Sequence, residues 1–133
     1  MKSSRAFCLS VPWAWLAFVS ACSTPPTTAA GYDVSATAKF DKGDYDGAIA
    51  DYTKAIALAP TDAMAYFCRA RARESNNDFD GAIADYSKVI ELVPTNADAY
   101  NDRGFAKESK GDLDGAAADL NQAAKLKSQQ PSH

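Results

Sequence analysis

The chain has 133 residues, of which 47% are apolar and 23% charged, a composition typical of one globular domain rather than a disordered chain. A net charge of −3 does not favour nucleic-acid binding. The single His is His133, at the end of the sequence, so neither a zinc site nor a His-activated nucleophile is expected. Three Cys residues are too few for a disulfide framework.

The N-terminal residues have the pattern of an export signal. Lys2 and Arg5 precede an uncharged run, Ala6–Val19, whose 14 residues fall short of the roughly 20 that a transmembrane helix needs. Two small residues follow this run, as they do before a cleavage site. We predict that residues 1–21 are a signal peptide and that residues 22–31, rich in Ser, Thr and Pro, are a flexible linker.

The sequence Val19-Ser20-Ala21-Cys22 resembles the bacterial lipobox. The resemblance implies cleavage before Cys22 and lipidation of its thiol, and acyl chains on that thiol would hold the domain at a bilayer. Ser23, rather than Asp, comes next, which implies an outer-membrane lipoprotein of the bacterial cell envelope that faces the periplasm. The alternative is an ordinary cleavage site with Cys22 as a bystander, which would make the protein soluble in the periplasm or secreted.

A stretch of ten residues recurs three times at a constant interval. The copies begin at Gly43, Asn77 and Gly111, and the first reads Gly-Asp-Tyr-Asp-Gly-Ala-Ile-Ala-Asp-Tyr. Pro60 and Pro94 are separated by the same interval. A constant period of this kind is typical of proteins in which one supersecondary unit is repeated. We predict three repeats, over approximately residues 29–62, 63–96 and 97–130.

Each unit is predicted to be a pair of helices. In the middle unit, apolar residues spaced by three or four indicate helices over residues 63–76 and 79–93. Asn77 lies between them, where the other units have Gly, and both residue types tolerate the left-handed conformation of a turn. Asp78 is placed to cap the second helix. Gly81, in the first turn of that helix, is expected to let the partner helix approach closely.

This pattern resembles the tetratricopeptide repeat, a helix-turn-helix unit of about 34 residues. The residues that carry the resemblance are Tyr66, Ala70, Phe79, Ala82, Tyr86 and Pro94 in the middle unit, and Tyr100, Gly104, Ala116 and Ala123 in the third. The first unit matches less well in its opening helix, residues 32–42, than in its second helix, residues 46–59. In the third unit, Leu120 replaces an aromatic residue and Ser128 a proline. The resemblance implies an all-α fold, an α-solenoid over residues 32–130.

Charged residues also repeat at the interval of the unit. Arg69 and Arg103 occupy one position of successive first helices, and Asp85 and Asp119 occupy one position of successive second helices. An Arg and an Asp that recur together predict a structural ion pair in each repeat, Arg69 with Asp85 and Arg103 with Asp119. The alternative is that these arginines bind a carboxylate of a ligand.

The resemblance places ligand binding in a concave groove that the first helices line. The matching residues are Met64, Phe67, Arg71, Ser75, Asn101, Phe105, Glu108 and Ser109. Phe67 and Phe105 are the most informative, because aromatic side chains frequently supply binding hot spots, although they could instead fill the packing between repeats. Some family members bind the C-terminal carboxylate of a ligand with Lys, Arg and Asn side chains of successive first helices. Arg71 and Asn101 match that set only in part, so this ligand is not implied.

Two further features have structural interpretations. The Asp-x-Asp-Gly sequences that begin at Asp44, Asp78 and Asp112 lack the ligands of a calcium loop, so we interpret them as helix caps. Cys68 is interpreted as a buried, unreactive thiol, because a redox role would require a lowered pKa.

These observations predict a protein–protein interaction module that binds a peptide or protein segment and is held at a membrane by a lipid anchor. The alternative is self-association, because the outer face of the last helix is left for an identical chain. We expect no enzyme and no cofactor, metal or nucleic-acid partner, because the sequence contains no recognisable nucleophile–base pair, phosphate loop or metal cluster. A pocket that held Glu74 or Glu108 with a strongly perturbed pKa would revive a catalytic interpretation.

Overall fold

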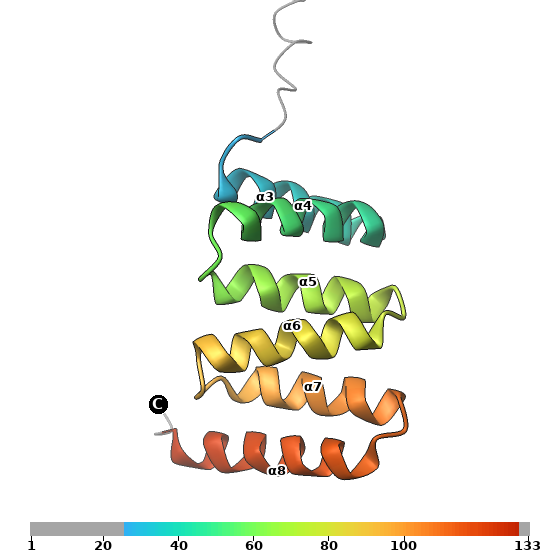
Figure 1. Cartoon of the computed structure of the whole chain (residues 1–133), viewed down its shortest axis with the longest axis vertical. Helices are drawn as coiled ribbons and strands as arrows, with labels where there is room; N and C mark the ends of the chain where they lie inside the picture. The colour runs from blue at the N-terminus through green and yellow to red at the C-terminus, as the bar shows by residue number, and fades with distance from the viewer. Residues whose placement is uncertain (1–25, 131–133) are drawn as a thin grey trace, which may run out of the picture.

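The computed structural model describes residues 26–130, which form six helices and no strand (Figure 1). The helices are α3 (Ala29–Asp41), α4 (Tyr45–Leu58), α5 (Ala63–Ser75), α6 (Phe79–Leu92), α7 (Ala97–Ser109) and α8 (Leu113–Gln129). None of these helices is long and apolar enough to cross a bilayer. The predicted signal peptide and Cys22 lie outside the described residues.

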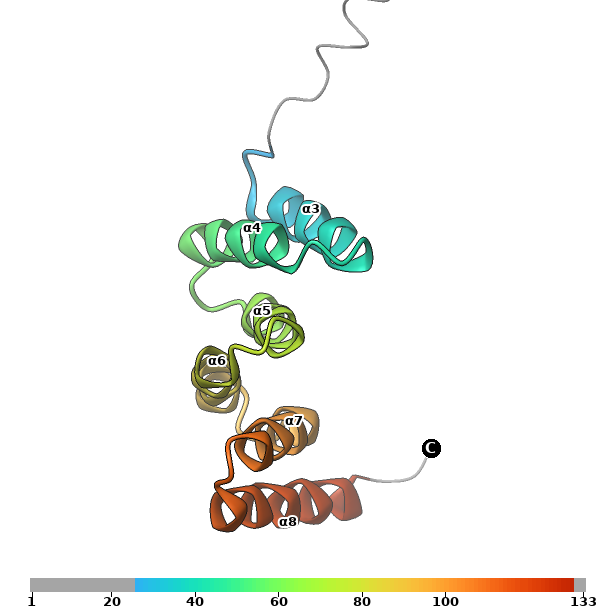
Figure 2. The same cartoon turned by 90° about the vertical axis from the view of Figure 1, so that its right-hand side faces the viewer.

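The helices form three hairpins that stack side by side: α3 with α4, α5 with α6, and α7 with α8 (Figure 1). Each helix packs mainly against the next one along the chain. In the view turned by 90°, α3, α5 and α7 lie on one side of the stack, α4 and α6 lie on the other, and α8 runs beneath α7 (Figure 2). The predicted all-α solenoid is therefore confirmed.

The observed helix boundaries lie within a few residues of the predicted ones. Helices α5 and α6 each end one residue before the predicted end, at Ser75 and Leu92. Helix α3 begins at Ala29 instead of residue 32, because Thr28 caps it by accepting a hydrogen bond from the backbone N–H of Gly31. Residues 29–31, the last three of the predicted linker, are therefore helical.

Helix α8 is longer than its equivalents, with 17 residues against 14 in α4 and α6. Pro60 and Pro94 follow those shorter helices, and proline lacks the amide hydrogen that would continue a helix. Ser128 occupies the same position of the third repeat and has that hydrogen. The helix therefore continues to Gln129.

The turn inside each hairpin depends on a residue in the left-handed conformation. The φ angles are 79° at Gly43, 60° at Asn77 and 84° at Gly111, as predicted for these positions. Asn is among the few residues other than Gly that adopt this conformation at low cost. In the next position Asp78 accepts a hydrogen bond of 3.0 Å from the backbone N–H of Gly81, which confirms the predicted cap.

The glycine in the first turn of each second helix makes room for the cap. A Cβ atom added at Gly47, Gly81 or Gly115 would overlap the carboxylate of the capping Asp three residues earlier. The predicted close approach of the partner helix occurs at Gly81 alone of these three, where a Cβ would lie 2.8 Å from Cδ of Arg73. At Gly47 and Gly115 the three nearest atoms to such a Cβ all belong to the capping Asp, so the cap is the tightest constraint there.

Small side chains fill most of the space between the helices. The fully or almost fully buried alanines include Ala36, Ala48, Ala65, Ala70, Ala72, Ala82, Ala99 and Ala106. Tyr86 and Val89 are the largest side chains that are completely buried in the described part of the chain. Because alanine has a short side chain, neighbouring helices pack closely, and the contact with each next hairpin repeats along the stack.

We expect Gly115→Ala to destabilise the protein by about 1 kcal/mol although Ala favours helix, because the new Cβ displaces the Asp112 carboxylate and breaks the cap. In an Asp112→Ala background there is no carboxylate to displace, so the same change at Gly115 should stabilise by up to about 1 kcal/mol. Urea unfolding of the four proteins measures both effects. The same sign in both backgrounds would contradict this role of the glycine.

Candidate functional site

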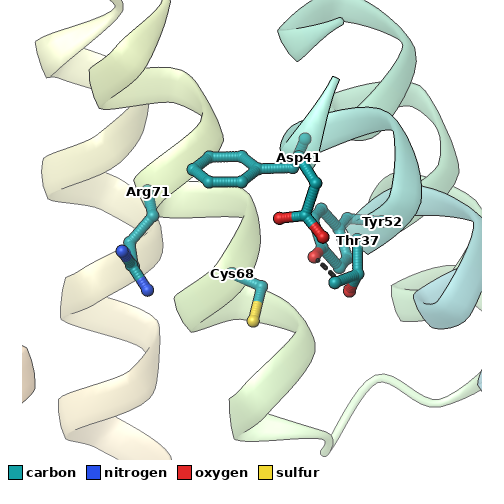
Figure 3. Close-up of a pocket in the computed structure, with 6 residues that line it drawn as sticks. Thr37, Asp41, Tyr52, Cys68 and Arg71 are labelled. Carbon is teal, nitrogen blue, oxygen red and sulfur yellow. Dashed lines mark hydrogen bonds between the residues drawn. The ribbon is translucent and has the colours of Figure 1, made fainter. Parts of the chain in front are cut away.

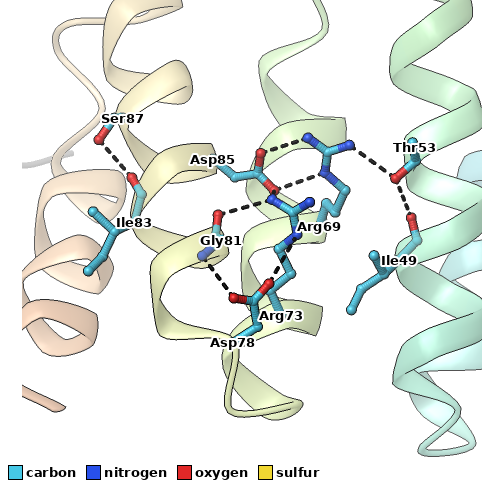
Figure 4. Close-up of polar contacts among 9 residues, drawn as sticks. All are labelled: Ile49, Thr53, Arg69, Arg73, Asp78, Gly81, Ile83, Asp85 and Ser87. Atoms are coloured by element: carbon cyan, nitrogen blue, oxygen red, sulfur yellow. Dashed lines mark hydrogen bonds and ion pairs between the residues drawn. The ribbon is translucent and has the colours of Figure 1, made fainter. Parts of the chain in front are cut away.

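Each repeat buries one carboxylate between its two helices. Asp51, Asp85 and Asp119 are each 4–5% exposed. Arg69 donates two hydrogen bonds to Asp85, from Nε at 2.9 Å and from Nη2 at 2.7 Å (Figure 4). Arg103 binds Asp119 in the same way, at 2.8 and 2.7 Å. The predicted partners therefore lie together, and these two arginines are engaged inside the protein rather than presented to a ligand.

The same two arginines also connect neighbouring repeats. Nη1 of Arg69 donates to the hydroxyl of Thr53 on α4 at 3.0 Å (Figure 4). Nη1 of Arg103 donates to the hydroxyl of Ser87 on α6, also at 3.0 Å. The sequence analysis missed both hydroxyls. They are separated by the repeat interval, which was a usable signal, but spacing alone does not show which helix of a neighbouring repeat they face.

A second side chain reaches each buried carboxylate, which the sequence analysis also missed. Nη1 of Arg73 lies 2.9 Å from the carboxylate of the middle repeat. Lys39 and Lys107 stand one repeat before and one repeat after Arg73, and they reach the carboxylates of their own repeats at 2.7 and 2.9 Å. In the first repeat, Ser35 takes the place of the arginine and donates to Asp51 at 2.7 Å.

These contacts change the acidity of two of the buried carboxyl groups, Asp119 and Asp51. Burial alone would raise the pKa of Asp119, but hydrogen bonds from Arg103 and Lys107 and their positive charges outweigh it and hold the pKa below the ordinary value. Lys39 and Ser35 have the same effect on the pKa of Asp51. The network therefore favours ionised carboxylates, and it acts as a structural element.

The candidate binding surface is a groove on the side of the stack formed by α3, α5 and α7. One hollow lies between α3 and α5 and is lined by Thr37, Phe40, Asp41, Tyr52, Cys68 and Arg71 (Figure 3). A second hollow lies near the beginnings of α5 and α7 and is lined by Ala63, Met64, Phe67, Val93, Asn96 and Asp98. We refer to these two hollows together as the groove.

Three of the predicted binding residues on α5 line the groove. The Met64 side chain is 66% exposed, and Arg71 is exposed with its guanidinium 5.8 Å from the ring centre of Phe40. Phe67 lines the second hollow and also packs on the core, with its ring edge-on to that of Tyr86 at 5.5 Å. The Phe67 ring therefore both lines the groove and packs against the core, as each of the two alternatives for this residue predicted in part.

The predicted residues on α7 lie outside the lining of the two hollows. Phe105 is 48% exposed, Glu108 is exposed, and the Asn101 amide donates to the carboxylate of Asp102 at 3.3 Å. Ser109 donates its hydroxyl hydrogen bond to the backbone carbonyl of Phe105. Of this set, Phe105 offers the largest exposed apolar side chain.

Cys68 lines the first hollow together with Tyr52 (Figure 3). Burial raises the pKa of this thiol, and the hydrogen bond with Tyr52 and the charge of Arg71 do not reverse the shift. A raised pKa keeps the thiol protonated at neutral pH, which is the opposite of what a redox-active cysteine requires. In residues 26–130 no group of His, Cys, Asp and Glu side chains is arranged to hold a metal ion.

Comparison with known proteins identifies the repeat. A family model described as tetratricopeptide repeat matches twice, over residues 35–97 and 69–131. The chain belongs to the tetratricopeptide repeat family. The overlap of the two matches agrees with tetratricopeptide hairpins that continue one into the next. A search of curated proteins found no match.

Several solved tetratricopeptide structures are similar to this one. The crystal structure of MamA has a TM-score of 0.75 and 31% identity, and the match covers 77% of this chain and 60% of that chain. The first TPR domain of Spaghetti (RPAP3), bound to the HSP90 peptide SRMEEVD, has a TM-score of 0.73, 26% identity, and coverage of 77% and 82%. The TPR2B domain of yeast Sti1, in a complex with pHsp70, has a TM-score of 0.71, 32% identity, and coverage of 74% and 78%.

We expect Asp119→Asn to destabilise the tetratricopeptide stack by about 2 kcal/mol at pH 7, because it removes the charge that Arg103 and Lys107 bind. Since the pKa of Asp119 is lowered on folding, its contribution is complete above the unfolded pKa, about 3.9, and disappears as the pH falls below that value. Urea unfolding at several pH values measures the difference.

The exposed Asp114 on the same helix provides a matched control for this prediction. Asp114→Asn makes the same change in charge and should have little effect at any pH. A destabilisation by Asp119→Asn that stayed constant down to pH 3 would contradict the role of ionisation.

Proposed function

We propose that this chain captures a segment of a partner protein along the groove. The observation that carries the proposal is the exposure of apolar side chains on that face: Met64 is 66% exposed, Val93 39% and Phe105 48%. Met64, Phe67 and Val93 line the same hollow, and contiguous exposed apolar surface of this kind is typical of interaction sites. Because the side chains are spread along the stack, the expected ligand is a chain segment rather than a small molecule.

The similar structures support the same proposal. One holds the HSP90 peptide SRMEEVD, and another is a complex with pHsp70. These ligands are those of the similar proteins. We extend to this chain only the general role of binding a segment of another protein. The tetratricopeptide fold is typically a scaffold for interactions without catalytic function, so we propose a binding role and no reaction.

We further propose that a lipid on Cys22 holds the module at the bacterial envelope, with the domain on the periplasmic side. Support comes from the sequence: a basic start, an uncharged run and a lipobox-like ending. Helix α3 begins at Ala29, so few residues would separate the acyl chains from the first helix. Such a short tether would keep the groove near the membrane surface.

The binding proposal predicts where a partner touches the protein. A photoreactive amino acid at Met64 or Phe105 should form covalent adducts with a discrete partner in cells that produce this protein. The same amino acid at Glu91 is the control, because that side chain is exposed but lies on α6, in the other layer of helices. Equal adducts at all three positions, or none at Met64 and Phe105, would argue against the proposal.

The anchor proposal predicts the mass of the mature protein. Protein extracted from membranes with detergent should begin at Cys22 and carry the additional mass of acyl chains, and Cys22→Ser should abolish the added mass. Intact-mass spectrometry measures both results. A mature chain without added mass would show that the protein is secreted without lipid.

A further inference from the structure

We infer that the groove binds a cationic segment, in which Lys or Arg residues stand beside apolar side chains. This inference rests on the proposed function and specifies the chemistry of the partner. It follows from how the charges of the chain are distributed between the interior and the groove.

The lysines and arginines of the first helices are mostly used inside the protein. Arg69, Arg73 and Arg103 bind the buried carboxylates, as do Lys39 and Lys107. Of the residues that line the two hollows, Arg71 is the single cation. The positive charges that would balance the groove are therefore held in the network behind it.

Carboxylates, by contrast, remain without a cation on or beside the groove. Within residues 26–130, no ion pair forms at Asp33, Asp41, Asp62, Glu74, Asp102 or Glu108. Asp41 lines the first hollow, and Asp33 and Asp62 are close enough to Cys68 to act on its thiol. On the described first helices, unpaired carboxylates therefore outnumber the unpaired cation, Arg71, which favours attraction of a cationic ligand.

Asp33 shows most directly that an interaction is missing. Its Oδ1 is buried and accepts no hydrogen bond from any described residue. Burial and, after it, the charge of Asp62 raise the pKa of Asp33, so its negative charge is unfavourable in the absence of a partner. An ammonium or guanidinium group bound close to this carboxylate would supply the opposite charge that it lacks.

A second negative position lies between α5 and α7. The Tyr86 hydroxyl donates to Oε2 of Glu74 at 3.0 Å. Burial raises the pKa of Tyr86, the charges of Glu74 and Asp102 raise it further, and the charge of Arg71 opposes them without reversing the shift, so two carboxylates and one guanidinium lie near this hydroxyl. Asp33 on α3 acts on Cys68 of α5, and Glu74 on α5 and Asp102 on α7 both act on Tyr86, so acidic groups lie beside both spaces between first helices.

The apolar part of the groove completes the pattern. Met64, Phe67 and Val93 line the second hollow, where an aliphatic side chain of a ligand would be buried. A ligand with alternating cationic and aliphatic residues matches both features. An acidic ligand would match the apolar hollow and be repelled at the two acidic positions, because like charges brought together cost several kcal/mol.

The test uses two labelled peptides of equal length, one a repeat of Lys-Leu-Ala-Lys and the other a repeat of Glu-Leu-Ala-Glu. Fluorescence anisotropy with the purified protein should show at least a tenfold higher affinity for the lysine peptide at low salt. That affinity should fall as the salt concentration rises from about 0.05 to about 0.5 M, because exposed charges are screened. Equal affinity for the two peptides, or a preference for the glutamate peptide, would overturn the inference.

A pair of matched double variants separates the groove from the net charge of the chain. Asp33→Asn with Glu74→Gln should reduce the affinity for the lysine peptide about tenfold without lowering the melting temperature, since neither carboxylate forms an ion pair. Glu91→Gln with Asp114→Asn removes the same charge outside the groove and should change the affinity little. Equal losses in the two double variants would show general attraction to an acidic protein and would overturn the inference.

Failure of this inference can be distinguished from failure of the proposed function. If neither peptide binds while photoreactive groups at Met64 and Phe105 still give adducts, the charge preference is wrong and the capture of a partner stands. If neither peptide binds and no adducts form, both proposals fall.

Discussion

The arrangement of the helices depends on an ion pair that each of the last two repeats buries between its two helices. Burying an ionised carboxylate is costly unless nearly all its acceptor positions are filled, and here both oxygens of Asp85 receive hydrogen bonds from arginine. The guanidinium of Arg69 then has a donor left for Thr53 of the preceding repeat. One planar group thus sets the geometry within a repeat and between repeats, and through both it sets the shape of the groove.

Much of the fold could be predicted because its signals are local. Pro94 ends a helix pattern, Asn77 allows the turn, and Asp78 caps the following helix, so a few adjacent residues define each boundary. The pairing of Arg69 with Asp85 could be predicted because both recur at the same interval. The hydroxyl of Thr53 was missed because its role depends on which helix faces α4, and sequence spacing does not contain that information.

The candidate site was harder to predict than the fold, for two physical reasons. The repeat pattern places Phe67 on the inner face but does not show how deeply its ring is buried, and its contact with Tyr86 makes it part of the core as well. Net charge conceals how charges are distributed. A value of −3 for the whole chain does not reveal that cations such as Arg73 bind a buried carboxylate while carboxylates such as Asp41 line the groove.

The contact between repeats has a direction. Arg69 and Arg103 each reach back to a hydroxyl of the preceding repeat, whereas Ser35, in the same position of the first repeat, bonds to its own Asp51. At the other end, Asn121 occupies the position of Thr53 and Ser87 and is exposed. A further hairpin placed after α8 would therefore find an acceptor for its arginine at Asn121 on α8. A hairpin placed before α3 would receive no arginine from α3, because Ser35 stands in that position. This architecture is therefore suited to lengthen at its C-terminal end.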